Sequence, residues 1–194
     1  MLLLIDNFDS FSHILADLIR QTGVVLEVVR NDISLSELEQ INFEGLILSP
    51  GPGRPSEAGN LMQILEKYHL SKPILGVCLG HQAIGEFFGA SLIPNSIPTH
   101  GKVRQVIKST PHEYTQSVPN QFRVTRYHSL QLSNLPSELI SILESESGEI
   151  MGIAHYRLPI LGIQYHPEAY LTEYGLEIVR DWVIAFDLKA SISG

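Results

Sequence analysis

The segment that most constrains the fold is a short apolar run that ends in a glycine–cysteine–glycine pattern. Residues 73–77 begin with a proline and continue with apolar residues, which predicts a buried strand. Residues 79–88 predict a helix with one apolar face. Cys78 lies at the junction, with Gly76 two residues before it and Gly80 two residues after it. This spacing is typical of a strand-to-helix elbow, which exposes a nucleophilic side chain on a sharp turn.

The elbow would suit a cysteine nucleophile for physical reasons. Small residues on either side let the strand and the helix cross closely beneath the exposed side chain. The N-terminus of the helix directs free N–H groups and a partial positive charge at the sulfur, which lowers the pKa of a thiol and can hold an oxyanion. Most lone cysteines, however, are buried structural residues. The pentapeptide alone therefore leaves both interpretations of Cys78 open.

The first half of the chain alternates strands with helices. Strands are predicted at residues 2–5, 24–29, 46–48 and 74–77, and helices around residues 11–19, 34–37, 61–65 and 79–88. This order predicts an α/β fold with a doubly wound, mostly parallel sheet that is flanked by helices. The elbow would then occupy a central position in the sheet.

The pattern changes after residue 89. Short strands are predicted at residues 103–107, 122–125, 139–143, 150–154 and 160–165, before a helix around residues 176–186. Turn residues separate these strands, so we expect an additional small antiparallel sheet in the second half. No linker interrupts the pattern, and we expect residues 1–194 to form a single domain.

Residues 49–59 contain three prolines and three glycines, which excludes regular structure. This loop follows a predicted parallel strand. Ligands of such sheets bind beyond the carboxyl ends of the strands. The loop is therefore a candidate wall of a binding site.

A cysteine nucleophile needs a base, and the base needs an orienting group. His166 and Glu168 follow the apolar strand at residues 160–165, and residues two apart in an extended segment face the same side. The carboxylate can therefore fix the imidazole of His166. His81 and His128 are weaker candidates, the first as a packed residue of the elbow helix and the second as a loop-shaping residue or ligand contact. No histidine or cysteine spacing indicates a metal site.

Composition restricts the class of protein. The formal net charge of −8 argues against a nucleic-acid or anionic-membrane surface. The single cysteine excludes an internal disulfide. No apolar run approaches the length of a membrane span. We therefore expect a cytoplasmic protein that binds neither nucleic acid nor membranes.

Six motifs in order make the chain resemble the triad-type (class I) glutamine amidotransferases, in particular the glutaminase subunits of anthranilate synthase and of aminodeoxychorismate (para-aminobenzoate) synthase. They lie at residues 6–11 (Asp-Asn-Phe-Asp-Ser-Phe), 49–59 (Ser-Pro-Gly-Pro-Gly, then Glu-Ala-Gly), 76–82 (Gly-Val-Cys-Leu-Gly-His-Gln), 100–102 (His-Gly-Lys), 126–130 (Arg-Tyr-His-Ser-Leu) and 162–168 (Gly-Ile-Gln-Tyr-His-Pro-Glu). The resemblance covers nearly the whole chain.

The resemblance implies a role for each matching residue. Cys78 would attack the side-chain amide of glutamine, His166 would transfer the proton, and Glu168 would orient His166. A glutamyl thioester would then be hydrolysed to glutamate, without a cofactor or metal. The implied glutamine-binding residues, which include the backbone donors of an oxyanion hole, are Gly51, Pro52, Gly53, Leu79, Gln82, Ser129 and Leu130.

The resemblance also implies a partner. Ammonia is useful only if it reaches an acceptor, so we expect a large synthase subunit that binds and aminates chorismate. The favoured pathway is tryptophan biosynthesis through anthranilate. Alternatives are the para-aminobenzoate branch of folate biosynthesis, a subunit shared by both, a glutaminase for another acceptor, a γ-glutamyl peptidase, and a non-catalytic regulatory subunit.

Two positions depart from the family pattern. The residue after Glu168 is Ala169, where serine is usual, so a supporting hydrogen bond to the triad is expected to be missing. Position 53 is glycine, where para-aminobenzoate subunits often have cysteine. The second departure favours the anthranilate branch weakly.

Overall fold

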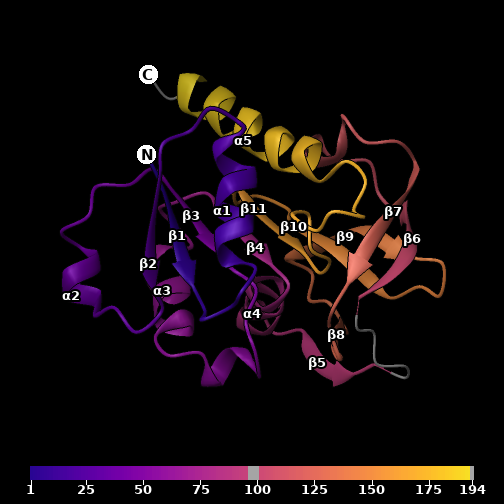
Figure 1. Ribbon diagram of the computed structural model, residues 1–194, viewed down its shortest axis with the longest axis horizontal. Helices are drawn as coiled ribbons and strands as arrows, with labels where there is room; N and C mark the ends of the chain where they lie inside the picture. The colour runs from indigo at the N-terminus through magenta and orange to yellow at the C-terminus, as the bar shows by residue number, and fades with distance from the viewer. Residues whose placement is uncertain (96–100, 193–194) are drawn as a thin grey trace.

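The computed structural model describes residues 1–95 and 101–192, with side chains through residue 186 (Figure 1). The strands are β1 (Leu2–Asp6), β2 (Leu26–Arg30), β3 (Gly45–Leu48), β4 (Ile74–Val77), β5 (Ser91–Pro94), β6 (Lys102–Lys108), β7 (Gln121–Arg126), β8 (Leu130–Ser133), β9 (Leu139–Ser145), β10 (Ile150–His155) and β11 (Ile160–Ile163). The α-helices are α1 (Ser12–Arg20), α2 (Leu35–Leu38), α3 (Leu61–Tyr68), α4 (Leu79–Phe88) and α5 (Gly175–Ile192), and two short 3₁₀ helices are η1 (Pro55–Glu57) and η2 (Glu113–Thr115). The motif residue His100 lies outside the described residues.

Nine strands form one mixed sheet in the order β2-β1-β3-β4-β11-β10-β9-β6-β7. Strands β2, β1, β3, β4 and β11 are parallel to one another, which confirms the predicted doubly wound arrangement. Strand β4 lies between β3 and β11, so the elbow that follows it is central, as predicted. The carboxyl ends of β4 and β11 therefore meet at one edge of the sheet.

The second half of the chain extends this sheet with antiparallel strands. Strands β10, β9, β6 and β7 pair with one another and join the parallel part through β11. The expected small antiparallel sheet is confirmed, but it consists of β5 and β8 alone. Neither of these two strands was among those predicted. Strand β11 ends at Ile163 rather than at residue 165, because its parallel neighbour β4 ends at Val77, the partner of Ile163.

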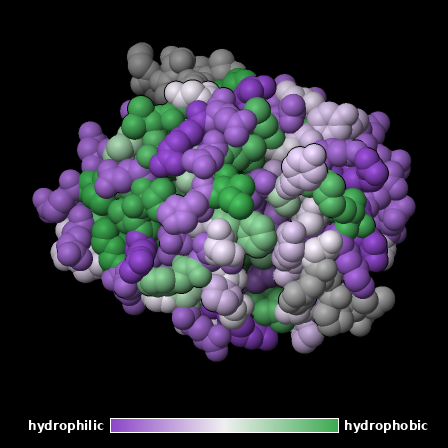
Figure 2. Space-filling view, in the orientation of Figure 1, coloured by the Kyte–Doolittle hydropathy of each residue, from purple (hydrophilic) through white to green (hydrophobic). Residues whose placement is uncertain are grey.

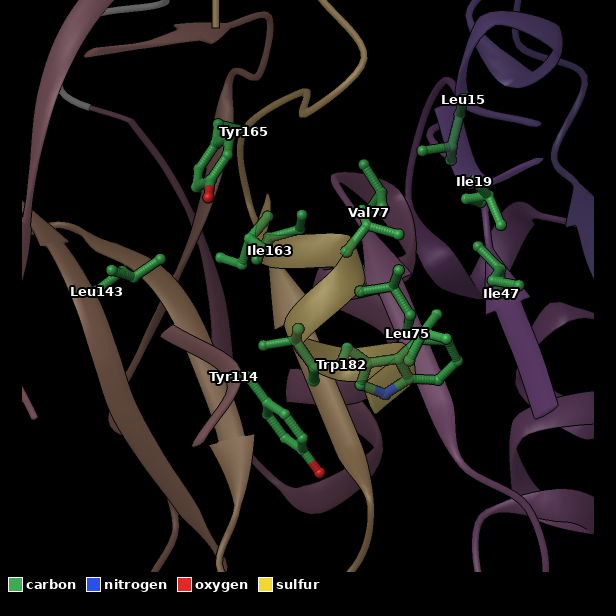
Figure 3. Close-up of a cluster of buried hydrophobic side chains, with 14 of the residues drawn as sticks. Leu15, Ile19, Ile47, Leu75, Val77, Tyr114, Leu143, Ile163, Tyr165 and Trp182 are labelled. Carbon is green, nitrogen blue, oxygen red and sulfur yellow. The ribbon is translucent and has the colours of Figure 1, made fainter. Parts of the chain in front are cut away.

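Alternating apolar residues send the sheet's side chains into two cores. In β1, Leu2 and Leu4 enter one core, and Leu3 and Ile5 enter the other. The first core is closed by α1 and α5, and Figure 3 shows Trp182 of α5 beside Leu75. The second core is closed by α2, α3 and α4. The result is a sheet covered on both faces, which fixes the edges where loops can form a site.

Apolar and polar side chains are interspersed on the face of the molecule that Figure 2 shows. Among the described residues, no helix has the length and apolar character needed to span a bilayer.

Candidate active site

The elbow has the geometry that its sequence predicts. Cys78 lies between β4 and α4 with φ 52° and ψ −98°, a conformation that L-residues rarely adopt. Its backbone N–H donates to the carbonyl of Ile163 in β11 at 2.9 Å, which ties the turn to the neighbouring strand. Strain held by surrounding structure is common at functional sites. The side chain of Cys78 is thus held in one direction at the edge of the sheet.

The glycines around Cys78 are required by close backbone contacts. A Cβ atom on Gly76 would lie 2.5 Å from the backbone of Gly80, and one on Gly80 would lie 2.3 Å from the carbonyl oxygen of Leu48. Any larger residue would separate the helix from the strands. The first turn of α4 therefore begins directly behind the sulfur.

His166 reaches Cys78 because β11 is the parallel neighbour of β4. The two side chains form a hydrogen bond with each other. Nδ1 of His166 also lies 2.6 Å from Oε1 of Glu168, and both of these side chains are buried. The predicted contact between residues 166 and 168 is therefore confirmed. The three side chains form a continuous Cys–His–Glu chain.

The His166–Glu168 pair is electrostatically unusual. Burial alone would lower the pKa of His166. Hydrogen bonds and negative charge from Cys78 and Glu168 outweigh burial and raise this pKa to about 10. The imidazole is thus disposed to carry a proton at neutral pH.

Two aromatic rings cover the imidazole. Phe11 and Tyr127 lie with their ring centroids 5.2 and 5.0 Å from that of His166, both edge-on, and they also contact each other. Phe11 precedes α1, and Tyr127 follows β7. The rings restrict the motion of the imidazole and its access to water.

A pocket of about 170 Å³ opens beside Cys78. It is lined by Gly51, Pro52, Gly53, Cys78, Gln82, Tyr127, His128, Ser129 and Leu130. Six of the seven predicted glutamine-binding residues are in this lining. The seventh, Leu79, supports the wall from behind, since its side chain occupies the space beside Gly51 that a Cβ atom would need. A larger pocket of about 780 Å³, beside β6, η2 and β7, contains none of the predicted site residues.

The wall formed by residues 128–130 is fixed by a buried polar network. Arg126 donates through Nε to Nε2 of His128 at 3.0 Å, so the imidazole proton resides on Nδ1, which lies 2.7 Å from the carbonyl oxygen of Leu130. Arg126 also forms a buried ion pair with Glu149 at 2.7 Å. Burial, with the charge of Arg126, lowers the pKa of His128 to about 4. His128 is therefore neutral at pH 7 and shapes the loop rather than transferring protons.

His81 is packed beneath the elbow, as predicted. Its side chain is fully buried, and burial lowers its pKa to about 3. Within residues 1–95 and 101–192, no group of three acidic, histidine or cysteine side chains is placed to hold a metal ion.

Several site residues were not selected from the sequence. Tyr127 lines the pocket and covers the imidazole, and Gln164 contacts the sulfur of Cys78. A signal for Gln164 was available, because it lies two residues before His166 and so faces the same side of an extended segment. The partnership of Arg126 with Glu149 had no comparable signal, since it joins two strands far apart in the sequence.

Ala169 has the consequence that its sequence suggested. Oε2 of Glu168 is buried and has no hydrogen-bond partner among the described residues. A serine at position 169 would carry a hydroxyl next to this carboxylate. The Glu168–His166 contact through the other oxygen is intact.

A Cys–His–Glu chain at the carboxyl edge of a doubly wound sheet, beside a small polar pocket, is the arrangement expected of a triad glutaminase. The family model "Glutamine amidotransferase class-I" matches residues 3–186, and the chain belongs to this family. It is thus a glutamine amidotransferase, and the predicted resemblance is confirmed.

Individual relatives refine the comparison. The chain is 40% identical to anthranilate synthase component 2 of Azospirillum brasilense, over 94% of this chain and 95% of that protein. It is 38% identical to aminodeoxychorismate/anthranilate synthase component 2 of Bacillus subtilis, over 94% and 95% of the two chains. The crystal structure of a protein from Thermoplasma acidophilum, named for GMP synthase, superposes with a TM-score of 0.88 at 29% identity, covering 99% and 96% of the two chains.

Proposed function

We propose that Cys78, His166 and Glu168 are the catalytic residues of a glutaminase. The observation that carries the proposal is their contact with one another at the pocket lined by the predicted glutamine-binding residues. The raised pKa of His166 favours an imidazolium that pairs with a Cys78 thiolate, the reactive form of the nucleophile. Glu168 holds the imidazolium in place.

The reaction proceeds in two steps. The thiolate of Cys78 attacks the side-chain amide carbon of glutamine and forms a C–S bond. His166 gives its proton to the leaving nitrogen as the C–N bond breaks, and ammonia departs. His166 then takes a proton from water, the resulting hydroxide attacks the glutamyl thioester, and the C–S bond breaks to release glutamate.

Backbone groups stabilise the charge that develops on the amide oxygen. The N–H of Leu79 belongs to the free N-terminal donors of α4, and the N–H groups of Gly51 and Gly53 lie in the facing loop. Pro52 contributes shape only, because it has no N–H. Gln82, Ser129 and Leu130 bind the α-amino and α-carboxylate end of glutamine.

The acceptor of ammonia is a large synthase subunit that aminates chorismate. The relatives named anthranilate synthase component 2 support the tryptophan pathway, in which the product is anthranilate. The Bacillus subtilis relative, named for both syntheses, supports a second candidate, which is the para-aminobenzoate branch or a subunit shared by both pathways. In either case residues 1–194 act as one glutaminase domain within a hetero-oligomer.

A covalent label tests the catalytic assignment. Cys78 is the single cysteine of the chain, so a diazoketone analogue of glutamine should add one equivalent of mass to the protein and none to Cys78→Ser. The Cys78→Ser complex with its synthase partner should still use ammonia but not glutamine. Glutamine use at the normal rate by this variant complex would contradict the assignment.

The pathway is tested by the aromatic product. The chain co-purified with its native synthase partner is given chorismate and glutamine. Anthranilate supports the tryptophan pathway, and para-aminobenzoate after the lyase step supports the folate pathway. Glutaminase activity without any aromatic amine would contradict both.

A further inference from the structure

A buried amide side chain connects the nucleophile to the pocket wall. Gln164 follows β11 and is fully buried. Its Nε2 lies 3.8 Å from the sulfur of Cys78, within hydrogen-bonding distance for sulfur, and its Oε1 accepts a hydrogen bond from Nε2 of Gln82 at 3.2 Å. Gln164 thus contacts the reactive atom on one side and a pocket residue on the other.

The two amides fix each other's orientation. Nε2 of Gln82 has a second acceptor, the carbonyl oxygen of Leu130, at 3.2 Å. With both protons of this nitrogen engaged, the oxygen of Gln82 is the group left for a ligand in the pocket that Gln82 lines. Reversing the amide of Gln164 would place nitrogen against nitrogen and turn an oxygen toward the sulfur. That arrangement is unfavourable for both neighbours.

The backbone explains why this side chain can reach both partners. Its N–H donates to the carbonyl of Met151 in β10 at 2.9 Å, which anchors residue 164 beyond the last paired residue of β11. Ile163 packs in the core closed by α1 and α5. Alternation therefore directs Gln164 to the opposite face, where α4 carries Gln82. A buried amide there must be hydrogen-bonded, and it uses both of its ends.

We propose that Gln164 is a positioning residue of the glutaminase site. It donates to the sulfur of Cys78, and it holds Gln82 with its oxygen toward the α-ammonium group of bound glutamine. This inference rests on the proposed function. It assigns to one side chain two separable effects, on the reactivity of the thiolate and on the affinity for glutamine.

Two substitutions separate these effects. Gln164→Glu keeps an oxygen that accepts from Gln82, but an ionised carboxylate cannot donate to the sulfur and repels the thiolate. Gln164→Leu removes both contacts with little change in volume. Gln105→Leu, in β6, is the matched control because it removes an amide whose partner is Gln121, outside the pocket lining.

The measurements are the pH dependence of Cys78 alkylation by iodoacetamide and the KM for glutamine of the complex with the synthase. Hydrogen bonds stabilise a thiolate, so both Gln164 variants should shift the acid limb of alkylation upward by about one pH unit. Gln164→Leu should raise KM by roughly tenfold, as expected for one hydrogen bond to a charged group. Gln164→Glu should leave KM within about twofold of the wild type.

Several results would overturn the inference. A wild-type alkylation profile in both variants would remove the role at the sulfur, and equal KM increases in both would remove the role at Gln82. Ammonia-dependent synthesis by each complex reports folding, and Gln164→Glu carries the alkylation test if the leucine variant does not fold. Failure of the proposed function is distinguishable, since the wild-type chain would then show neither glutamine hydrolysis nor diazoketone labelling.

Discussion

Replacing Glu168 with glutamine should lower the pKa of His166. The substitution preserves the size of the side chain but removes the negative charge 2.6 Å from Nδ1. Burial lowers the pKa of this imidazole, and contacts with Cys78 and Glu168 raise it to about 10. Without the carboxylate charge, burial and the sulfur are the principal remaining influences. The imidazolium should therefore lose its proton at a lower pH.

The magnitude follows from the hydrogen bond. A hydrogen bond to a charged group contributes about 1.5–3 kcal/mol, and about 1.4 kcal/mol corresponds to one pKa unit. We therefore expect the pKa of His166 to fall by about one to two units. The sign for stability is also defined. A raised folded-state pKa stabilises the protein fully below the unfolded value of 6.5, and this contribution is lost as the pH rises through about 10. In Glu168→Gln the loss should begin at lower pH.

The assay is an NMR titration of ¹⁵N-labelled histidine, with the His166 signal identified by its absence in His166→Gln. Glu173→Gln is the matched control, because it removes an exposed ion pair with Arg123 rather than a buried one. The alkaline limb of kcat for glutamine in the complex should move in the same direction as the NMR value. An unchanged or higher pKa of His166 in Glu168→Gln would refute the electrostatic reasoning.

Two further predictions concern packing and hydrogen bonding around the triad. Gly80→Ala should lower the free energy of unfolding by about 1–3 kcal/mol and slow diazoketone labelling, because its Cβ atom would lie 2.3 Å from the carbonyl oxygen of Leu48. Gly148→Ala, which meets no atom within 4 Å, should leave labelling unchanged, and equal labelling rates in both variants would contradict the steric argument. Ala169→Ser should raise the free energy of unfolding in urea by about 0.5–1.5 kcal/mol by giving Oε2 of Glu168 a donor, and a loss of stability would show that the hydroxyl does not reach it.

Much of the fold was predictable because its signals are local. Short apolar runs identified the parallel strands, and the glycines at positions 76 and 80 identified the elbow. The contact of His166 with Glu168 was also predictable, since it needs only an extended backbone between them. Strands β5 and β8 were not among the predicted strands; each has four residues, and the two pair only with each other.

The sequence alone therefore determined the doubly wound order of elements, the elbow at Cys78 and the His–Glu pair, because each depends on spacing within a few residues. Only the tertiary structure decided that β11 lies beside β4, which brings the imidazole to the sulfur and Gln164 to both Cys78 and Gln82. It also decided that Arg126 is paired with Glu149 behind the pocket wall. These contacts depend on the lateral order of strands, which results from burying two faces of one sheet at once and is not encoded in any local pattern.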